Sequence, residues 1–128
     1  MQLVMWSAAL LAGAVHVLIF CMESLWWTTP QVRARFRQSA DQAAATRLLA
    51  FNQGFYNLFL GIGALAGLAL VVLGHSRAGL ILVTWNCAFM LGAAVVLVLS
   101  APGMRRGALI QGAAPLLYLL LAAVHGAR

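Results

Sequence analysis

The sequence predicts an all-α, polytopic membrane protein that folds as an up-down bundle of four transmembrane helices. Hydrophobic residues make up 64% of the 128-residue chain and charged residues only 8%, whereas soluble domains typically carry about 25% charged residues. Four apolar segments are each long enough for a bilayer core, which needs roughly 17–25 residues per helix. Short turns join the later segments, so consecutive helices should be antiparallel neighbours. We therefore treat residues 1–128 as one integral membrane domain.

The apolar segments and the breaks between them place the four helices. They are expected at about residues 3–27, 47–73, 79–99 and 108–124. Pro30 should end the first helix, because proline disfavours helical backbone in the residue before it. Ser39 and Gln42 have the spacing of a helix N-cap, which predicts a short interfacial helix over residues 38–46. The segments GHSR and SAPGMRRG are typical of tight turns.

The arginines favour one orientation in the membrane. Arginine supplies all eight basic residues, and six of them lie in or beside the first and third connections. Since basic residues are in excess in cytoplasmic loops, we expect these connections in the cytoplasm and both termini outside. Arg33, Arg35 and Arg37 should also contact anionic lipids. The basic residues flank apolar runs and form no stripe with interleaved aromatics, so we expect no nucleic-acid partner.

Each predicted helix carries its polar residues on one face. At about 100° per residue, His16, Glu23 and Trp27 share a face of the first helix. The polar faces of the other helices carry Asn52, Gln53, Tyr56 and Asn57 in the second helix, Asn86 in the third and Gln111 in the fourth. Because polar groups in lipid must find partners inside the protein, these faces should meet in a pocket open toward the cytoplasmic half. We expect its amide and aromatic members to be ligand-binding. Its rim should consist of Trp26, Trp27, Phe55 and Tyr56.

His16 and Glu23 are the candidate catalytic residues of this pocket. They are about 10.5 Å apart along the helix axis at the usual rise per residue, so they would flank a ligand instead of bonding to each other. His16 would act as an acid–base group or proton relay and Glu23 as the complementary carboxylate, since a low-dielectric pocket perturbs titratable groups most. Asn52, Gln53 and Asn57 would orient a polar head, and the aromatic side chains would hold an apolar tail.

The same residues also have structural interpretations. Glu23 could form an ion pair with Arg47 near the membrane interface. His16 could be a core histidine that donates to a backbone carbonyl or to Asn57, and the amides could serve as interhelical hydrogen bonds. No group of residues has the spacing of a metal site, and we expect neither a metal nor a cofactor.

Small residues in the second and third segments predict close helix packing. The pattern Gly63-x-x-x-Gly67 and the cluster Gly92-Ala93-Ala94 would each let a neighbouring helix approach its backbone closely. In lipid, helix association depends on this kind of packing, because apolar side chains gain little by leaving the lipid tails for one another.

Two blocks of the sequence resemble a known family. The first runs from His16 through Glu23 and the block WTTP (27–30) to Phe36, and the second is NQGFYN (52–57). Both are similar to a family of small bacterial integral membrane proteins, domain of unknown function 1304. The resemblance covers essentially the whole chain. It implies four membrane helices and a bacterial cytoplasmic membrane, and it implies no particular activity.

Three functions are compatible with these patterns. The one we favour is binding of a lipid or hydrophobic small molecule, or acid–base chemistry on it; whether the protein is an enzyme stays open. A structural or accessory membrane subunit is the alternative, in which the polar residues only pack. A proton-coupled small transporter, with Glu23 as the titrating group, is the third. It would need a dimer, since four helices are few for alternating access. Membrane lipids are the expected partners, and a homo-oligomer is left open.

Overall fold

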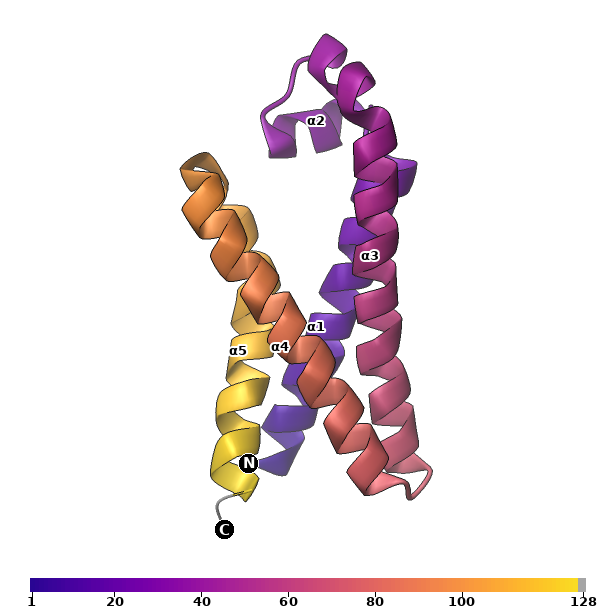
Figure 1. Ribbon diagram of the computed structural model, residues 1–128, viewed down its shortest axis with the longest axis vertical. Helices are drawn as coiled ribbons and strands as arrows, with labels where there is room; N and C mark the ends of the chain where they lie inside the picture. Colours follow the sequence, from indigo (N-terminus) through magenta and orange to yellow (C-terminus); the bar gives the residue numbers. More distant parts are fainter. Residues whose placement is uncertain (127–128) are drawn as a thin grey trace.

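Helices account for almost all of the chain in the computed structural model, which describes the backbone of residues 1–126 and the side chains of residues 1–124. In chain order the elements are α1 (Gln2–Phe20), the π-helix η1 (Cys21–Leu25), α2 (Pro30–Phe36), α3 (Ala40–Val72), α4 (Ser76–Ser100), the 3-10 turn η2 (Pro102–Met104) and α5 (Arg105–Gly126), as Figure 1 shows. No strand lies within residues 1–126, and the predicted all-α class is confirmed.

The four long helices form the predicted up-down bundle. α1 packs against α3, α3 against α4 and α4 against α5, and α5 closes the ring against α1. The N-terminus therefore lies at the same end as the turn between α3 and α4, which we call the turn end (Figure 1). The opposite end holds α2, η2 and the first turns of α3 and α5. We call it the arginine-rich end, because it carries Arg33, Arg35, Arg37, Arg47, Arg105 and Arg106.

Four segments are long and apolar enough to cross a membrane. They are Gln2–Leu25, Ala40–Val72, Ser76–Ser100 and Pro102–Val124. Large apolar side chains cover the outside of the bundle; Leu3, Val72 and Leu99 are 79%, 86% and 76% exposed. An apolar surface this extensive marks contact with a partner or a membrane. The chain is therefore a multi-pass membrane protein.

The predicted boundary between the first connection and the second span is wrong. Ser39 caps α3 as expected, because its Oγ accepts a hydrogen bond from the Gln42 backbone at 3.1 Å and its own N–H donates to the Gln42 side chain at 2.9 Å. The helix then continues without a break to Val72, since the alanines that follow the cap are the strongest helix formers. At 1.5 Å per residue the 33 residues of α3 are about 50 Å long, so its first turns project beyond a hydrocarbon core of about 30 Å.

The end of the first span also differs from the prediction. The α-helical part stops at Phe20, and the π-helix ends at Leu25 instead of residue 27. Pro30 occupies the first turn of a further helix, α2, where its fixed φ angle fits and its missing N–H costs no hydrogen bond. α2 ends at Arg37, whose φ of 56° is left-handed. The first connection is thus a folded segment that bends back over the bundle.

Small residues set the spacing of α3 toward the turn end. A Cβ atom on Gly67 would lie 3.0 Å from the carbonyl oxygen of Gly79 in α4. On the opposite side of α3, a Cβ on Gly61 would lie 2.9 Å from the carbonyl oxygen of Gly13 in α1. A Cβ on Gly63 would overlap the side chain of Asn86 in α4. Larger residues would push these helices apart, so the predicted role of Gly63-x-x-x-Gly67 in close packing is confirmed. The buried core beside these contacts consists of Met5, Ala8, Ala9, Ala12, Ala64, Val83, Cys87, Met90, Ala114 and Tyr118.

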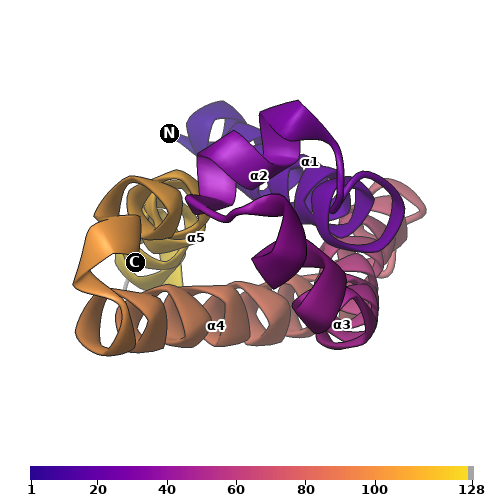
Figure 2. The same ribbon diagram turned by 90° about the horizontal axis from the view of Figure 1, so that it is seen from above.

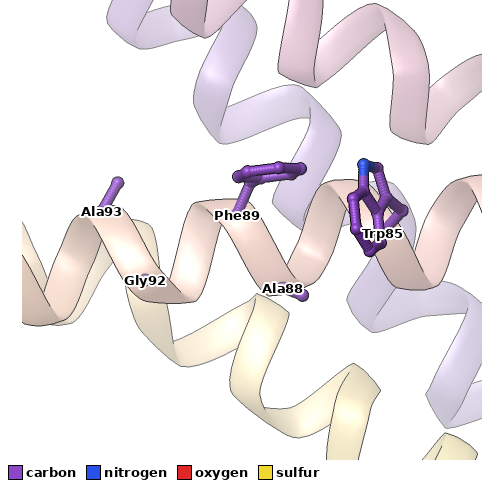
Figure 3. Close-up of a pocket in the computed structure, with 5 residues that line it drawn as sticks. All are labelled: Trp85, Ala88, Phe89, Gly92 and Ala93. Carbon is purple, nitrogen blue, oxygen red and sulfur yellow. The ribbon is translucent and has the colours of Figure 1, made fainter.

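The small residues of α4 play different parts. Ala94 packs against α5, because its Cβ would lie 2.8 Å from a Cβ on Gly112. The prediction fails for Gly92, where a Cβ would have nothing within 4 Å because the residue faces outward. It belongs to a shallow apolar groove of about 370 Å³ on the outer face of α4, where the rings of Trp85 and Phe89 meet edge to face at 5.2 Å (Figure 3).

Candidate functional site

A π-helix presents Glu23 at the arginine-rich end. In this turn the N–H of Trp26 donates to the carbonyl oxygen of Cys21 at 2.9 Å, a bond that spans five residues instead of four. Ser24 joins the turn to α3, because its Oγ donates to the carbonyl oxygen of Phe51 at 2.9 Å. Gly54 makes this approach feasible, since any side chain there would overlap Ser24. Single π turns inside helices are frequent at functional sites.

The carboxyl group of Glu23 is held by α3. Its Oε2 accepts a hydrogen bond of 2.9 Å from Nδ2 of Asn57, which also donates to the backbone oxygen of Gln53 at 3.2 Å. Among the described side chains Glu23 has no ion-pair partner, so the alternative of a structural pair with Arg47 is wrong. The carboxylate is thus oriented by an amide and its charge is not neutralised by an arginine.

A cavity of about 610 Å³ opens beside Glu23. It lies at the end where α4 and α5 diverge from α1 and α3, and α2 reaches over this end from α1 towards α5 (Figures 1 and 2). Its polar lining consists of Glu23, Arg35, Arg37, Gln38, Gln53, Arg106 and Gln111. Its remaining lining consists of Ile19, Met22, Trp27, Ala34, Phe36, Leu97, Gly103, Met104, Gly107 and Ile110. Every helix of the bundle contributes to it.

Trp27 forms the wall between α2 and α3. Its ring is buried, and its Nε1 donates to Oγ1 of Thr46 at 3.3 Å. The ring centroid lies 4.8 Å from that of Phe36, and Val32 and Ala43 complete this small apolar cluster. Trp27 therefore holds α2 in place over the bundle while one side of it borders the cavity.

The structure brings together four of the residues that the sequence assigned to the pocket. Glu23, Trp27, Gln53 and Gln111 line the same cavity, and Asn57 stands behind Glu23 through its hydrogen bond. Glu23, Gln53 and Gln111 come from three spans that are distant in sequence, and Trp27 follows the first of them. Their binding role stays a prediction, but they do share one cavity.

The remaining predicted residues lie elsewhere. His16 is buried, with Nδ1 donating to the Ala12 carbonyl oxygen at 2.9 Å, and it is not among the residues that line the cavity. This is the contact expected of a core histidine. Asn86 donates to the Leu82 carbonyl oxygen at 2.8 Å, and its amide lies against Gly63 of α3.

The expected aromatic rim is also only partly formed. Tyr56 is 71% exposed on the outside of α3, and Trp26 is exposed as well. Phe55 packs edge to face on Phe20, with ring centroids 5.2 Å apart, and does not line the cavity. Asn52 is exposed and donates within its own helix. Of the expected rim, Trp27 alone among the described side chains borders the cavity.

The site also has a cationic part that was not predicted from the sequence. Arg35, Arg37 and Arg106 line the cavity together with Gln38, although the arginines were assigned only to membrane orientation and lipid contact. Nη1 of Arg37 reaches to 3.4 Å from the position of a Cβ on Gly103, on the opposite wall. The sequence did contain a signal for this cationic lining. Two connections that contain arginines are expected at the same end of an up-down bundle.

This arrangement suits an amphipathic molecule. One end of the cavity offers guanidinium, amide and carboxyl groups, which form hydrogen bonds with a polar head. The aliphatic side chains of Ile19, Leu97 and Ile110 and the thioethers of Met22 and Met104 supply much of the apolar lining. Ligand sites commonly combine a mostly apolar lining with a few convergent polar groups.

Comparison with known proteins identifies a family and no activity. A family model described as "Protein of unknown function (DUF1304)" matches residues 10–123. No curated protein and no solved structure matches the chain. The site therefore has to be interpreted from its own geometry.

Proposed function

The chain belongs to the DUF1304 family, and from its cavity we propose that it is a membrane protein that binds a lipid or another hydrophobic small molecule at the arginine-rich end. The observation that carries this proposal is the cavity of about 610 Å³, which unites Glu23, Gln53 and Gln111 from separate helices. This volume lies within the range of roughly 300–1,000 Å³ that is usual for small-molecule sites.

Glu23 is the central polar contact of the proposed site. An ionisable group within a membrane span is costly and is usually retained for function. Asn57 fixes its orientation, and the side-chain amides of Gln53 and Gln111 add donors and acceptors beside it. Since His16 lies outside the cavity lining, we propose binding and assign no reaction to a His16–Glu23 pair.

We further propose that the protein resides in the bacterial cytoplasmic membrane, with the arginine-rich end in the cytoplasm and both termini outside. Six of the eight arginines lie at that end, as the excess of basic residues in cytoplasmic loops predicts. Single cysteines at Ser39 and at Ser76, each in a Cys21→Ala, Cys87→Ala background, test this. In intact cells an impermeant maleimide should label Ser76→Cys only, and labelling of Ser39→Cys would reverse the orientation.

Native mass spectrometry of the full chain in mild detergent tests the binding proposal. The wild type should carry a discrete bound mass. Glu23→Gln keeps the size of the side chain and removes the carboxylate, so the fraction of protein that carries the bound species should fall strongly. Gln53→Ala should weaken binding, because Gln53 lines the cavity. Asn52→Ala is the matched control, since the neighbouring amide points away from the cavity and bonds only to its own helix.

Two other results would replace the proposal. A wild type without bound species, and with all three variants equally folded, would favour a structural or accessory subunit. Uptake into proteoliposomes that depends on pH and is lost in Glu23→Gln would favour a proton-coupled transporter that works as a dimer.

A further inference from the structure

We propose that the ligand of this cavity is an anionic amphiphile whose phosphate group is bound by Arg35, Arg37 and Arg106. This inference rests on the proposed function, because it names the chemistry of the molecule that the cavity binds. It concerns a defined site inside the protein and not the general attraction of basic loops to anionic membranes.

The three arginines converge from separate parts of the chain. Arg35 lies in α2, Arg37 caps that helix, and Arg106 lies in the first turn of α5. The fold places all three around one cavity. The cavity lining has three arginines and one glutamate, which gives a formal charge of 3 − 1 = +2. A cavity with this balance favours an anion over a cation.

The guanidinium groups are available for a ligand. Within the described part of the chain, none of the three guanidinium groups has a hydrogen-bond or ion-pair partner in the protein. Nη1 of Arg37 extends across the cavity to the wall at Gly103. Guanidinium groups present paired donors in a planar fork that matches the oxygens of a phosphate. A phosphate between the two walls would accept charge-assisted hydrogen bonds from these donors.

A second observation points to the same ligand. Oε1 of Gln38 is buried in the cavity wall without a hydrogen-bond partner. A buried acceptor without a donor is costly and uncommon in folded proteins. If the Gln38 side chain turns toward the cavity that it lines, a hydroxyl group on the head of the ligand would supply that donor next to the arginines. Phosphate and hydroxyl groups occur together in glycerophosphate headgroups.

The order of side chains along the helices matches the layout of an amphiphile. On α5, Arg106 precedes Gln111 by five residues, or about 7.5 Å along the axis. On the first span, Ile19 lies four residues deeper than Glu23, or about 6 Å. The cavity thus has guanidinium groups at the end of the bundle and amide and carboxyl groups deeper, with Ile19 deepest on the first span. The phosphate would sit above Glu23, with the ester region beside the amides and the chain below.

The test compares three probes on the full-length protein in detergent by native mass spectrometry. Phosphatidylglycerol carries the phosphate, the hydroxyl groups and the chains. Diacylglycerol with the same chains lacks the phosphate, and sn-glycerol 3-phosphate lacks the chains. We expect phosphatidylglycerol to bind at least about tenfold more tightly than diacylglycerol, the change expected for loss of a charge-assisted hydrogen bond. It should also bind more tightly than sn-glycerol 3-phosphate, which lacks the apolar contacts of the chains.

Adjacent arginines provide the matched variants. Arg106→Gln removes a cavity guanidinium and should weaken phosphatidylglycerol binding about tenfold. Arg105→Gln makes the same change of charge one residue earlier, outside the cavity lining, and should leave binding unchanged. Equal losses in both variants would mean general surface attraction and would overturn the inference.

The probes also separate the inference from the proposed function. If phosphatidylglycerol and diacylglycerol bind equally and both are lost in Glu23→Gln, the phosphate site is wrong while the binding function stands. If sn-glycerol 3-phosphate binds as tightly as the lipid, the ligand is a soluble phosphate and the amphiphile is wrong. If the wild type binds none of the three and carries no other species, the proposed function itself fails.

Discussion

The two ends of the bundle are built from the same four helices and yet pack in opposite ways. Toward the turn end, α3 and α4 touch through Gly67 and Gly79 so closely that a Cβ on Gly79 would lie 2.5 Å from the backbone oxygen of Gly67. At the arginine-rich end, Gln53 of α3 and Gln111 of α5 face a cavity of about 610 Å³. Figure 1 shows α4 and α5 diverging from α1 and α3 toward that end.

Side-chain size along each interface accounts for this difference. In a bilayer, helix association depends on van der Waals packing and interhelical hydrogen bonds, because lipid tails solvate apolar side chains as well as a protein does. Glycine and alanine let the backbones of α3 and α4 meet at the turn end, whereas at the other end only η1 and α3 stay in close contact, through Gly54. The turn end can therefore serve as a rigid frame for a cavity that stays open.

The largest effect is expected from closing the space between α3 and α4. Gly79→Ala would place a Cβ against backbone atoms of Gly67 and Val71, and backbone cannot move aside as the end of a side chain can. The free energy of unfolding should fall by about 3 kcal/mol, the upper part of the range for overpacking. A denaturant titration in mixed detergent, followed by far-ultraviolet circular dichroism, measures this.

Gly92→Ala is the control on the same helix. A Cβ there meets nothing within 4 Å, so the only expected change is a gain of about 0.5–1 kcal/mol from the better helix former. If Gly79→Ala were as stable as Gly92→Ala, the close packing of the turn end would not be what stabilises the frame.

The spans of this frame were predictable because long apolar runs determine them. The details of the first connection were not. Pro30 was interpreted as the end of one helix, whereas it begins the next, and proline is compatible with both positions. Residues 38–46 were predicted as a separate interfacial helix because they are polar, but polarity does not interrupt a helix. The only cap in that region is Ser39, and no breaking residue separates it from the second span.

The second prediction concerns the hydrogen bond between the two spans that position the carboxylate. Asn57→Ala leaves Glu23 without its only described partner and should lower the free energy of unfolding by about 1–2 kcal/mol. It should also reduce the bound mass in native spectra, because Glu23 would no longer be oriented. Asn52→Ala should change neither quantity. A loss of stability with full binding would make the Glu23–Asn57 contact purely structural.

Helical phase predicted the candidate site in part. Gln53 and Gln111 were correctly predicted to face a common space. The helix that carries each of them is a regular α-helix from the arginine-rich end onward, so helical phase applies. The shared face of His16 and Glu23 was assumed from about 100° per residue, and the π-helix between Cys21 and Leu25 breaks that assumption because each of its residues turns through a smaller angle. For Asn52 and Tyr56, phase shows which residues share a face but not which face points inward.

The smallest effect is expected at a polar contact of the rigid half. The hydroxyl oxygens of Tyr118 and Thr84 are 3.0 Å apart in a hydrogen bond between α5 and α4. Tyr118→Phe keeps the buried ring and removes only this bond, and interhelical hydrogen bonds in membranes average about 0.6 kcal/mol. The same detergent titration should show a loss of about that size, with ligand binding unchanged. A loss as large as that of Gly79→Ala would mean that hydrogen bonds and not small residues hold the turn end together, and the contrast between the two ends would then need another cause.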